Sequence, residues 1–185
     1  MYKDPWYINE RIFVSSGKVL YVCLIRTSET DDPFINAIEL RTLRDGMYTQ
    51  AKPGTSLQAY RRVDFGGHST VRYPQDNFDR IWTSDYLLNI HDAAGVRTVS
   101  SEETISTNNT KNLPPAAVMQ TACVLNGSAF PFRFGAPAGS KSLLLMYLAE
   151  IEKLKMFKRR SFYVMINGEE KKSLKSLLWC KIILP

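Results

Sequence analysis

Residues 34–43, which read FINAIELRTL, carry the clearest secondary-structure pattern in the chain. Successive side chains of a β-strand point to opposite faces of the sheet, so side chains of one parity share a face. One face would hold Phe34, Asn36, Ile38 and Leu40, and the other Ile35, Ala37, Glu39 and Arg41. This alternation predicts a β-strand over the segment.

Short segments of the same kind lie on both sides of it. Residues 19–27 (VLYVCLIRT) are rich in β-branched and aromatic side chains, and residues 60–65 precede the turn pair Gly66-Gly67. Further strands are predicted at residues 117–125, 130–134, 142–150 and 161–167, the last ending at an Asn167-Gly168 turn signal. The only helical pattern is at residues 150–160, which fit a strand end and a basic loop equally well. Many short strands separated by turns predict an all-β sandwich with little helix.

Two polar stretches interrupt the strands. Residues 44–56 (RDGMYTQAKPGTS) contain two glycines and a proline, which is typical of a linker between modules. Residues 99–115 are rich in Ser, Thr, Asn and Glu and end in a proline pair, so we expect a long exposed loop there.

The composition is that of a globular protein, and its charge is unevenly distributed. The 185 residues are 44% hydrophobic and carry 24 Lys+Arg against 18 Asp+Glu, which excludes a disordered chain and a disulfide-dense miniprotein. Residues 1–150 hold 15 basic and 15 acidic side chains, whereas residues 151–185 hold 9 and 3. A nucleic-acid-binding domain spreads basic charge over its fold, so no nucleic-acid partner is expected. The basic residues at 153–160 and 171–181 suit a solvated loop and tail, with an anionic surface as the alternative partner.

The ends of the chain and its cysteines complete this description. Residues 1–14 contain no apolar run of signal-peptide length, and no stretch reaches the roughly 20 apolar residues of a membrane span. Cys23, Cys123 and Cys180 each lie in an apolar, strand-like context, which predicts buried free thiols. An odd number of cysteines leaves open a disulfide partner outside the chain.

Several segments resemble the malectin-like region of plant leucine-rich-repeat receptor-like kinases. They follow one another in the order of that family: residues 32–41 (DPFINAIELR), 62–67 (RVDFGG), 71–82 (VRYPQDNFDRIW), 114–122 (PPAAVMQTA), 147–154 (YLAEIEKL) and 162–168 (FYVMING). The resemblance covers roughly residues 10–170 and leaves residues 169–185 unmatched. It implies two tandem β-sandwich modules of the jelly-roll type, related to animal malectin, which binds carbohydrate.

The resemblance also implies a division of the chain. Residues 1–43 would be the last strands of a first module, 44–57 a linker, 58–168 most of a second module and 169–185 a divergent tail. Both modules would be incomplete, which suggests a truncated gene product. An unpaired sheet edge is unfavourable, so residues 11–43 are a candidate to dock where the second module lacks strands.

A group of loop residues is the candidate ligand site. Carbohydrate sites place aromatic rings against sugar C–H groups and use carboxylates and amides to fix hydroxyls. The densest such group is Tyr73, Phe78 and Trp82 with Asp76, Asn77 and Asp79 interleaved, and we take Tyr73, Phe78, Asp79 and Trp82 as ligand-binding candidates. The alternative is that Phe78 and Trp82 are core residues and that Asp79 pairs with Arg80.

Catalytic and metal-binding patterns are weak. His68 and His91 have no spacing typical of a metal site, and Asp64-Phe65-Gly66 lacks the other kinase motifs. Glu150 and Glu152 would share a strand face, as in a glycosidase, although a solvated strand end explains them as well. We expect no catalytic residue, no metal and no cofactor.

The expected function is therefore ligand perception at the plant cell surface. Asn108-Asn109-Thr110 and Asn126-Gly127-Ser128 are acceptor sequences for N-glycosylation, so Asn108 and Asn126 are candidates for that modification. The resemblance implies a plasma-membrane parent with the module on the extracellular side, although this chain shows neither signal nor anchor. The expected partner is a cell-wall or other carbohydrate. The alternatives are a module that binds peptide or co-receptor protein without sugar, and a truncated product without function.

Overall fold

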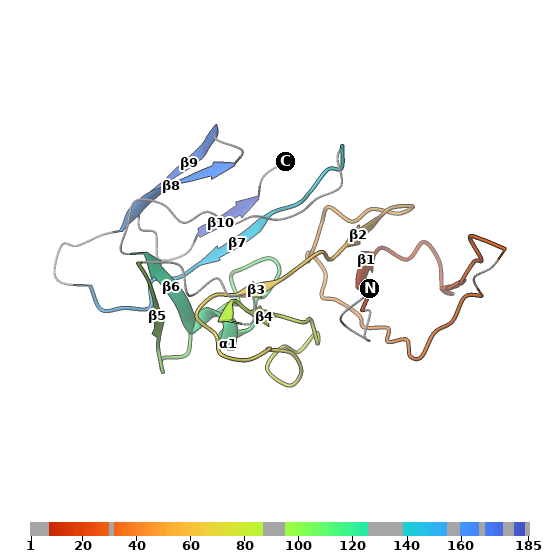
Figure 1. Cartoon of the computed structure of the whole chain (residues 1–185), viewed down its shortest axis with the longest axis horizontal. Helices are drawn as coiled ribbons and strands as arrows, with labels where there is room; N and C mark the ends of the chain where they lie inside the picture. Colours follow the sequence, from red (N-terminus) through yellow and green to blue (C-terminus); the bar gives the residue numbers. More distant parts are fainter. Residues whose placement is uncertain are drawn as a thin grey trace. The chain divides into compact units, whose positions relative to one another are not determined.

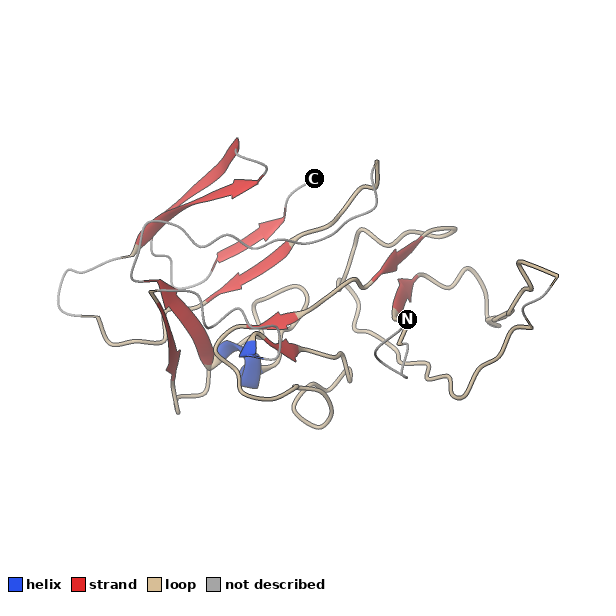
Figure 2. Ribbon diagram, viewed as in Figure 1, coloured by secondary structure: helices blue, strands red, loops and turns tan. Residues whose placement is uncertain are grey.

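The computed structural model of the chain describes residues 8–29, 32–86, 95–125, 139–154, 160–166, 169–175 and 180–183. Two compact units, Met1–Arg62 and Val63–Pro185, divide the chain. Strands far outnumber helices among the described residues, and the only α-helix there is the four-residue α1 (Ala116–Met119) (Figure 2). The predicted all-β class with little helix is confirmed.

The first unit is built on one short antiparallel pair, β1 (Arg11–Phe13) with β2 (Ser56–Gln58). The amide of Ala59 extends the ladder by donating to the carbonyl of Glu10 at 3.0 Å. The guanidinium of Arg62 donates to both carboxylate oxygens of Glu10, at 2.6 and 2.7 Å. This bidentate pair adds a charged contact between the two strand ends.

Residues 44–51 fold back on themselves within this unit. The amide of Met47 donates to the carbonyl of Arg44 at 3.1 Å, and the amide of Ala51 to that of Tyr48 at 2.9 Å. The side chains of Met47, Tyr48 and Ala51 are buried. The segment that the sequence suggests as a linker is thus a series of packed turns, and the boundaries of the modules stay predictions.

The strands predicted at residues 19–27 and 34–43 are wrong. No described residue of these segments is in a strand, and every described residue from Phe13 to Thr42 is exposed. An alternating sequence would place apolar side chains on one face of a strand. A strand also needs a neighbouring strand with which its backbone forms hydrogen bonds. We call residues 19–43 the apolar arm. The arm contains no strand among its described residues, and the docking of residues 11–43 onto the second module stays a prediction.

The second unit consists of four two-stranded sheets within the described residues (Figure 1). Two short strands, β3 (Val63–Asp64) and β4 (Thr83–Ser84), run parallel. The other pairs are antiparallel: β5 (Val96–Ser100) with β6 (Thr121–Leu125), β7 (Leu145–Leu148) with β10 (Cys180–Ile183), and β8 (Ser161–Ile166) with β9 (Glu169–Lys175). Residues 169–183, for which the sequence showed no resemblance, thus contribute two strands.

Most predicted strands of this unit are present but shorter. The strand predicted at 161–167 is β8, that at 142–150 is β7, and only β3 forms within 60–65. Residues 117–125 divide into the end of α1 and β6, since α1 begins directly after Pro115, which has the extended conformation of an N-cap residue (φ −64°, ψ 145°). The segment 130–134 lies outside the described residues. Of residues 150–160, the described 150–154 and 160 are neither helix nor strand.

The loop predicted over residues 99–115 is only partly exposed. Its first two residues end β5, while Asn112, Pro114 and Pro115 at its other end are buried. This end of the segment is buried because the guanidinium of Arg80 donates hydrogen bonds to the backbone carbonyls of Asn112 and Leu113.

Candidate functional site

The loop of residues 71–82 is closed at its base by an antiparallel bridge. The amide of Val71 donates to the carbonyl of Trp82 at 3.0 Å, and the amide of Trp82 to that of Val71 at 2.9 Å. Within the loop, the amide of Asp76 donates to the carbonyl of Arg72 and the amide of Asp79 to that of Asp76, both at 2.9 Å. We call this segment the closed loop.

The carboxylate of Asp76 lies buried at the centre of the closed loop. Its Oδ1 accepts a hydrogen bond from the amide of Phe78 at 2.8 Å. Its Oδ2 accepts from the indole Nε1 of Trp82 at 2.7 Å and from Nε of Arg80 at 2.8 Å. Three donors therefore compensate the burial of this charge, as a buried carboxylate requires.

Arg80 joins the closed loop to residues 112 and 113. Its side chain is only 2% exposed, and its Nη1 and Nη2 donate to the carbonyls of Asn112 and Leu113, both at 2.6 Å. The guanidinium carbon lies 5.2 Å from the ring centre of Phe78 and 5.4 Å from that of Trp82. The sequence suggested the adjacent Asp79 as the ion-pair partner of Arg80, and the structure gives Arg80 a buried ion pair with Asp76, four residues earlier.

Asp79 is bound by residues of its own loop. It adopts a φ of +50°, and its carboxylate accepts from Nε and Nη2 of Arg72 at 2.9 and 2.8 Å and from the amide of Tyr73 at 2.9 Å. The side chain is 4% exposed. Asp79 therefore fixes the backbone on which Tyr73 is mounted.

The four candidate ligand residues lie on the same loop but differ in exposure. Tyr73 is 64% exposed, Phe78 is half-buried and Trp82 is 4% exposed, with its ring edge-on to Tyr147 at 6.1 Å. Tyr73 is thus the one ring of the three that is open to solvent. Beside it in the sequence are exposed Gln75 and Asn77. Gln75 is not among the residues that the sequence suggested, although its amide lies in the same motif.

Two further carboxylates are buried where the parallel strands end. Asp64 ends β3 and Asp85 follows β4, and parallel strands bring these ends to one edge. Oδ1 of Asp64 accepts from Oγ1 of Thr121 at 2.9 Å, and the carboxylate of Asp85 accepts from the amide of Gly66 at 2.9 Å and from Sγ of Cys123 at 2.8 Å. These contacts attach β6 to the β3–β4 pair.

The burial of this cluster changes its ionisation. Burial raises the pKa of Asp64 to about 6, and the charge of Asp85 adds to the increase. Burial and the carboxylate of Asp85 raise the pKa of Cys123 to about 12, so its thiol is protonated and a poor nucleophile. Cys123 is free and half-buried, but Cys23 is free and exposed, so its predicted burial is wrong. The side chain of Cys180 lies outside the described residues.

The Gly66-Gly67 turn is required by this cluster. A Cβ on Gly66 would lie 2.7 Å from the carbonyl oxygen of Ala122, and one on Gly67 would overlap the carboxylate of Asp64. Gly66 also has a φ of +82°, where other residues are strained.

Glu150 and Glu152 form ion pairs. Nη1 and Nη2 of Arg97 donate to the carboxylate oxygens of Glu152, both at 2.8 Å, and Nε of Arg160 lies 2.8 Å from Glu150. Arg160 also contacts Glu152. The hydrogen bonds from Arg97 and then Arg160 lower the pKa of Glu152 to about 2, opposite to the raised pKa of a catalytic acid.

The remaining sequence candidates differ in what can be said of them. Asn108 is exposed in a turn at residues 107–110, whereas Asn126, His91 and the side chains of residues 171–181 lie outside the described residues. The described part of the chain contains no group of three or more His, Cys, Asp or Glu able to hold a metal ion. Nor does any helix there have the length and apolarity needed to cross a membrane.

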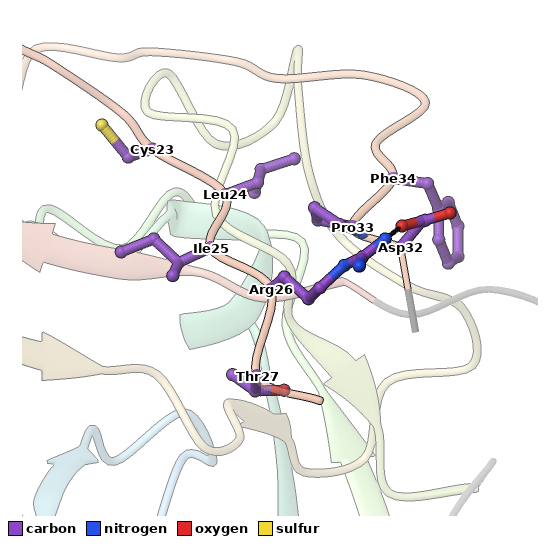
Figure 3. A pocket seen from close by; sticks show the side chains of 8 residues that line it. All are labelled: Cys23, Leu24, Ile25, Arg26, Thr27, Asp32, Pro33 and Phe34. Carbon is purple, nitrogen blue, oxygen red and sulfur yellow. Dashed lines mark ion pairs between the residues drawn. The ribbon is translucent and has the colours of Figure 1, made fainter. Parts of the chain in front are cut away.

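A hollow occurs in the apolar arm, away from these candidates in the sequence (Figure 3). It is lined by Cys23, Leu24, Ile25, Arg26, Thr27, Asp32, Pro33 and Phe34. The figure shows the ion pair between Arg26 and Asp32, and all of the lining residues are exposed. The hollow is a surface feature of the arm without buried polar groups.

Comparison with known proteins finds one family and a set of plant relatives. Residues 2–180 match the family model described as malectin-like domain. An uncharacterized Arabidopsis thaliana protein, At1g24485, is 30% identical over 88% of this chain and 31% of its own length. Two Arabidopsis thaliana LRR receptor-like serine/threonine-protein kinases are similar: At1g67720, described as probable, is 34% identical over 84% of this chain and 17% of its own length, and At2g14510 is 30% identical over 87% and 18%. The chain thus spans less than a third of the length of these relatives. No solved structure matches.

Proposed function

Because the chain belongs to the malectin-like domain family, we propose that it is a ligand-binding module of the extracellular kind found in plant receptor-like kinases and that its ligand is a carbohydrate. The proposed location is the outer side of the plasma membrane. The proposal includes no catalytic activity, no metal and no cofactor. The pairing of Glu152 with arginines and the protonated state of Cys123 support that choice.

The observation that carries the proposal is the exposed ring of Tyr73 on a rigid loop. Two buried carboxylates, Asp76 and Asp79, hold the loop closed, so a ligand meets a ring whose backbone is already fixed. Aromatic rings on pre-organised loops bind the apolar faces of sugars at low entropic cost. The exposed amides of Gln75 and Asn77 are of the type that hydrogen-bonds sugar hydroxyls.

The other candidates would act through the loop. In this proposal Tyr73 contacts the ligand, while Phe78, Asp79 and Trp82 position the loop that presents it. Substitution of Asp79 would then weaken binding indirectly, by releasing the amide of Tyr73 and the side chain of Arg72.

A glycan array tests the proposal. We expect the purified chain to bind a subset of plant cell-wall glycans and Tyr73→Ala to lose that binding. The matched control is Tyr163→Ala, which removes an equally exposed ring, 65% against 64%, from β8. Equal binding by both folded variants would remove Tyr73 from the site.

A specific observation favours a second candidate, the contact with a peptide or co-receptor protein. The apolar arm exposes large apolar side chains in quantity: Val19, Leu20, Tyr21, Val22, Leu24, Ile25, Phe34, Ile35, Ile38 and Leu40. Exposed patches of this kind mark protein contacts. A silent glycan array together with co-precipitation of a receptor ectodomain, lost in Ile25→Asp, would favour this function over sugar binding.

The third possibility is a truncated product without function. A cooperative unfolding transition is the property that such a product would lack. We expect a single urea transition for the second unit, and its absence would favour the third possibility.

A further inference from the structure

The turn at residues 107–110 exposes an acceptor asparagine. The amide and the hydroxyl of Thr110 both donate to the carbonyl of Thr107, at 2.9 and 2.7 Å. Asn108 and Asn109 therefore occupy the two central positions of the turn, and both are exposed. Asn108-Asn109-Thr110 has the sequence that N-glycosylation requires.

We propose that Asn108 carries an N-linked oligosaccharide, a modification that rests on the proposed extracellular location. The co-reactant is an oligosaccharide joined through a diphosphate to a lipid. Nδ2 of Asn108 forms a bond to C1 of the first sugar, while the bond between C1 and the diphosphate oxygen breaks. The lipid diphosphate leaves with the electron pair, and the amide gives up one proton to a base.

The folded turn accommodates the product of this reaction. Neither Asn108 nor its neighbours Asn109 and Lys111 are buried, so a glycan there displaces no packed side chain. The nearby Asn112 is 2% exposed and is followed by Leu113-Pro114, which is not an acceptor sequence. Exposure and sequence thus select Asn108 among the described asparagines of this segment.

The same turn limits when transfer occurs. The hydroxyl of Thr110, which the acceptor sequence requires, is engaged by the carbonyl of Thr107 in the folded chain. Transfer therefore precedes closure of the turn, during translocation of the chain. Afterwards the glycan is attached four residues before Asn112, which Arg80 holds against the closed loop.

Expression in mammalian cells behind a cleavable secretion signal tests the inference. The background variant Asn126→Gln removes the other acceptor sequence. In that background we expect a glycan that peptide-N-glycosidase removes, with Asn108 converted to Asp in the released peptide. The glycan is lost in Asn108→Gln and retained in the matched control Asn109→Gln, which leaves the acceptor sequence intact.

The two proposals fail separately in this design. The supplied signal makes glycosylation independent of the natural location, and the glycan array uses enzymatically deglycosylated protein. An unmodified Asn108 peptide, from secreted protein or from chain retained in the cells, would overturn the inference and leave sugar binding untouched. A glycosylated chain that binds no sugar would overturn the proposed ligand alone.

Discussion

At the scale of single residues, Arg80 is the residue on which the candidate site depends most. It compensates Asp76, binds two carbonyls of residues 112–113 and contacts two aromatic rings, all from a position 2% exposed. The spacing of Asp76 and Arg80 was visible in the sequence, but so was the adjacent Asp79. Only the fold shows which of the two carboxylates meets the guanidinium, because the loop turns at Asp79 with a positive φ.

Removal of Arg80 leaves a buried carboxylate without its cation. We expect Arg80→Met to lower the free energy of unfolding by about 3–5 kcal/mol, the usual cost of breaking a buried pair on one side. Urea unfolding measures it, with exposed Arg61→Met as the control, expected within about 0.5 kcal/mol of the parent. Similar free energies of unfolding for the two variants would show that the contacts of Arg80 do not stabilise the fold.

Asp64 predicts the pH dependence of stability. Its pKa is raised from 3.8 to about 6, so the folded state binds a proton more tightly than the unfolded state does. The stabilisation that arises from protonated Asp64 is complete below about pH 4 and is lost as the pH rises through about 6. The loss amounts to about 3 kcal/mol at most between pH 4 and 7.

The variant Asp64→Asn isolates this effect. Urea unfolding at intervals from pH 4 to 7.5 should give a flatter profile for the variant than for the parent. The pKa of Glu152 is lowered from 4.5 to about 2, so its contribution falls only at the acidic end of this range, and it does so equally in the parent and the variant. Identical profiles would show that Asp64 does not carry the pH dependence.

At the scale of elements, alternation predicted some strands correctly and failed where a partner was lacking. Residues 161–167 gave β8, which pairs with β9. Residues 34–43 alternate more regularly but form no strand. Periodicity is a property of one segment, whereas a β-strand forms only when it pairs with a second segment. The helix α1 was missed because apolar residues 116–119 are too few to distinguish a helical turn from a strand.

Substitutions in the apolar arm test whether it lacks packing partners. We expect Ile25→Asp and Ile38→Asp to change the free energy of unfolding by less than about 0.5 kcal/mol and to reduce binding of a hydrophobic dye. Val118→Asp, which introduces a charge at a buried position of α1, should cost several kcal/mol. Arm variants as unstable as Val118→Asp would mean that the arm is packed.

At the scale of the whole molecule, family and fold class could be predicted from the sequence, but the composition of the site could not. The motif at residues 71–82 predicted a candidate loop through its rings, acids and amide, and whether that loop binds a ligand stays a prediction. It could not show that Trp82 and Asp79 face inward while Tyr73 faces solvent, because exposure depends on contacts such as that between Trp82 and Tyr147, 65 residues later. Part of the positive charge of residues 151–185 is compensated within the fold, because Arg160 forms ion pairs with Glu150 and Glu152.

Titration of the strongest array glycan into parent and variant chains tests sugar binding through Tyr73 most directly. A stacked ring contributes roughly 1–1.5 kcal/mol, which corresponds to about a five- to thirteenfold change in affinity. We expect a Kd at least about fivefold higher for Tyr73→Ala and unchanged for Tyr163→Ala. Equal Kd values for parent and Tyr73→Ala, with both chains folded, would contradict it.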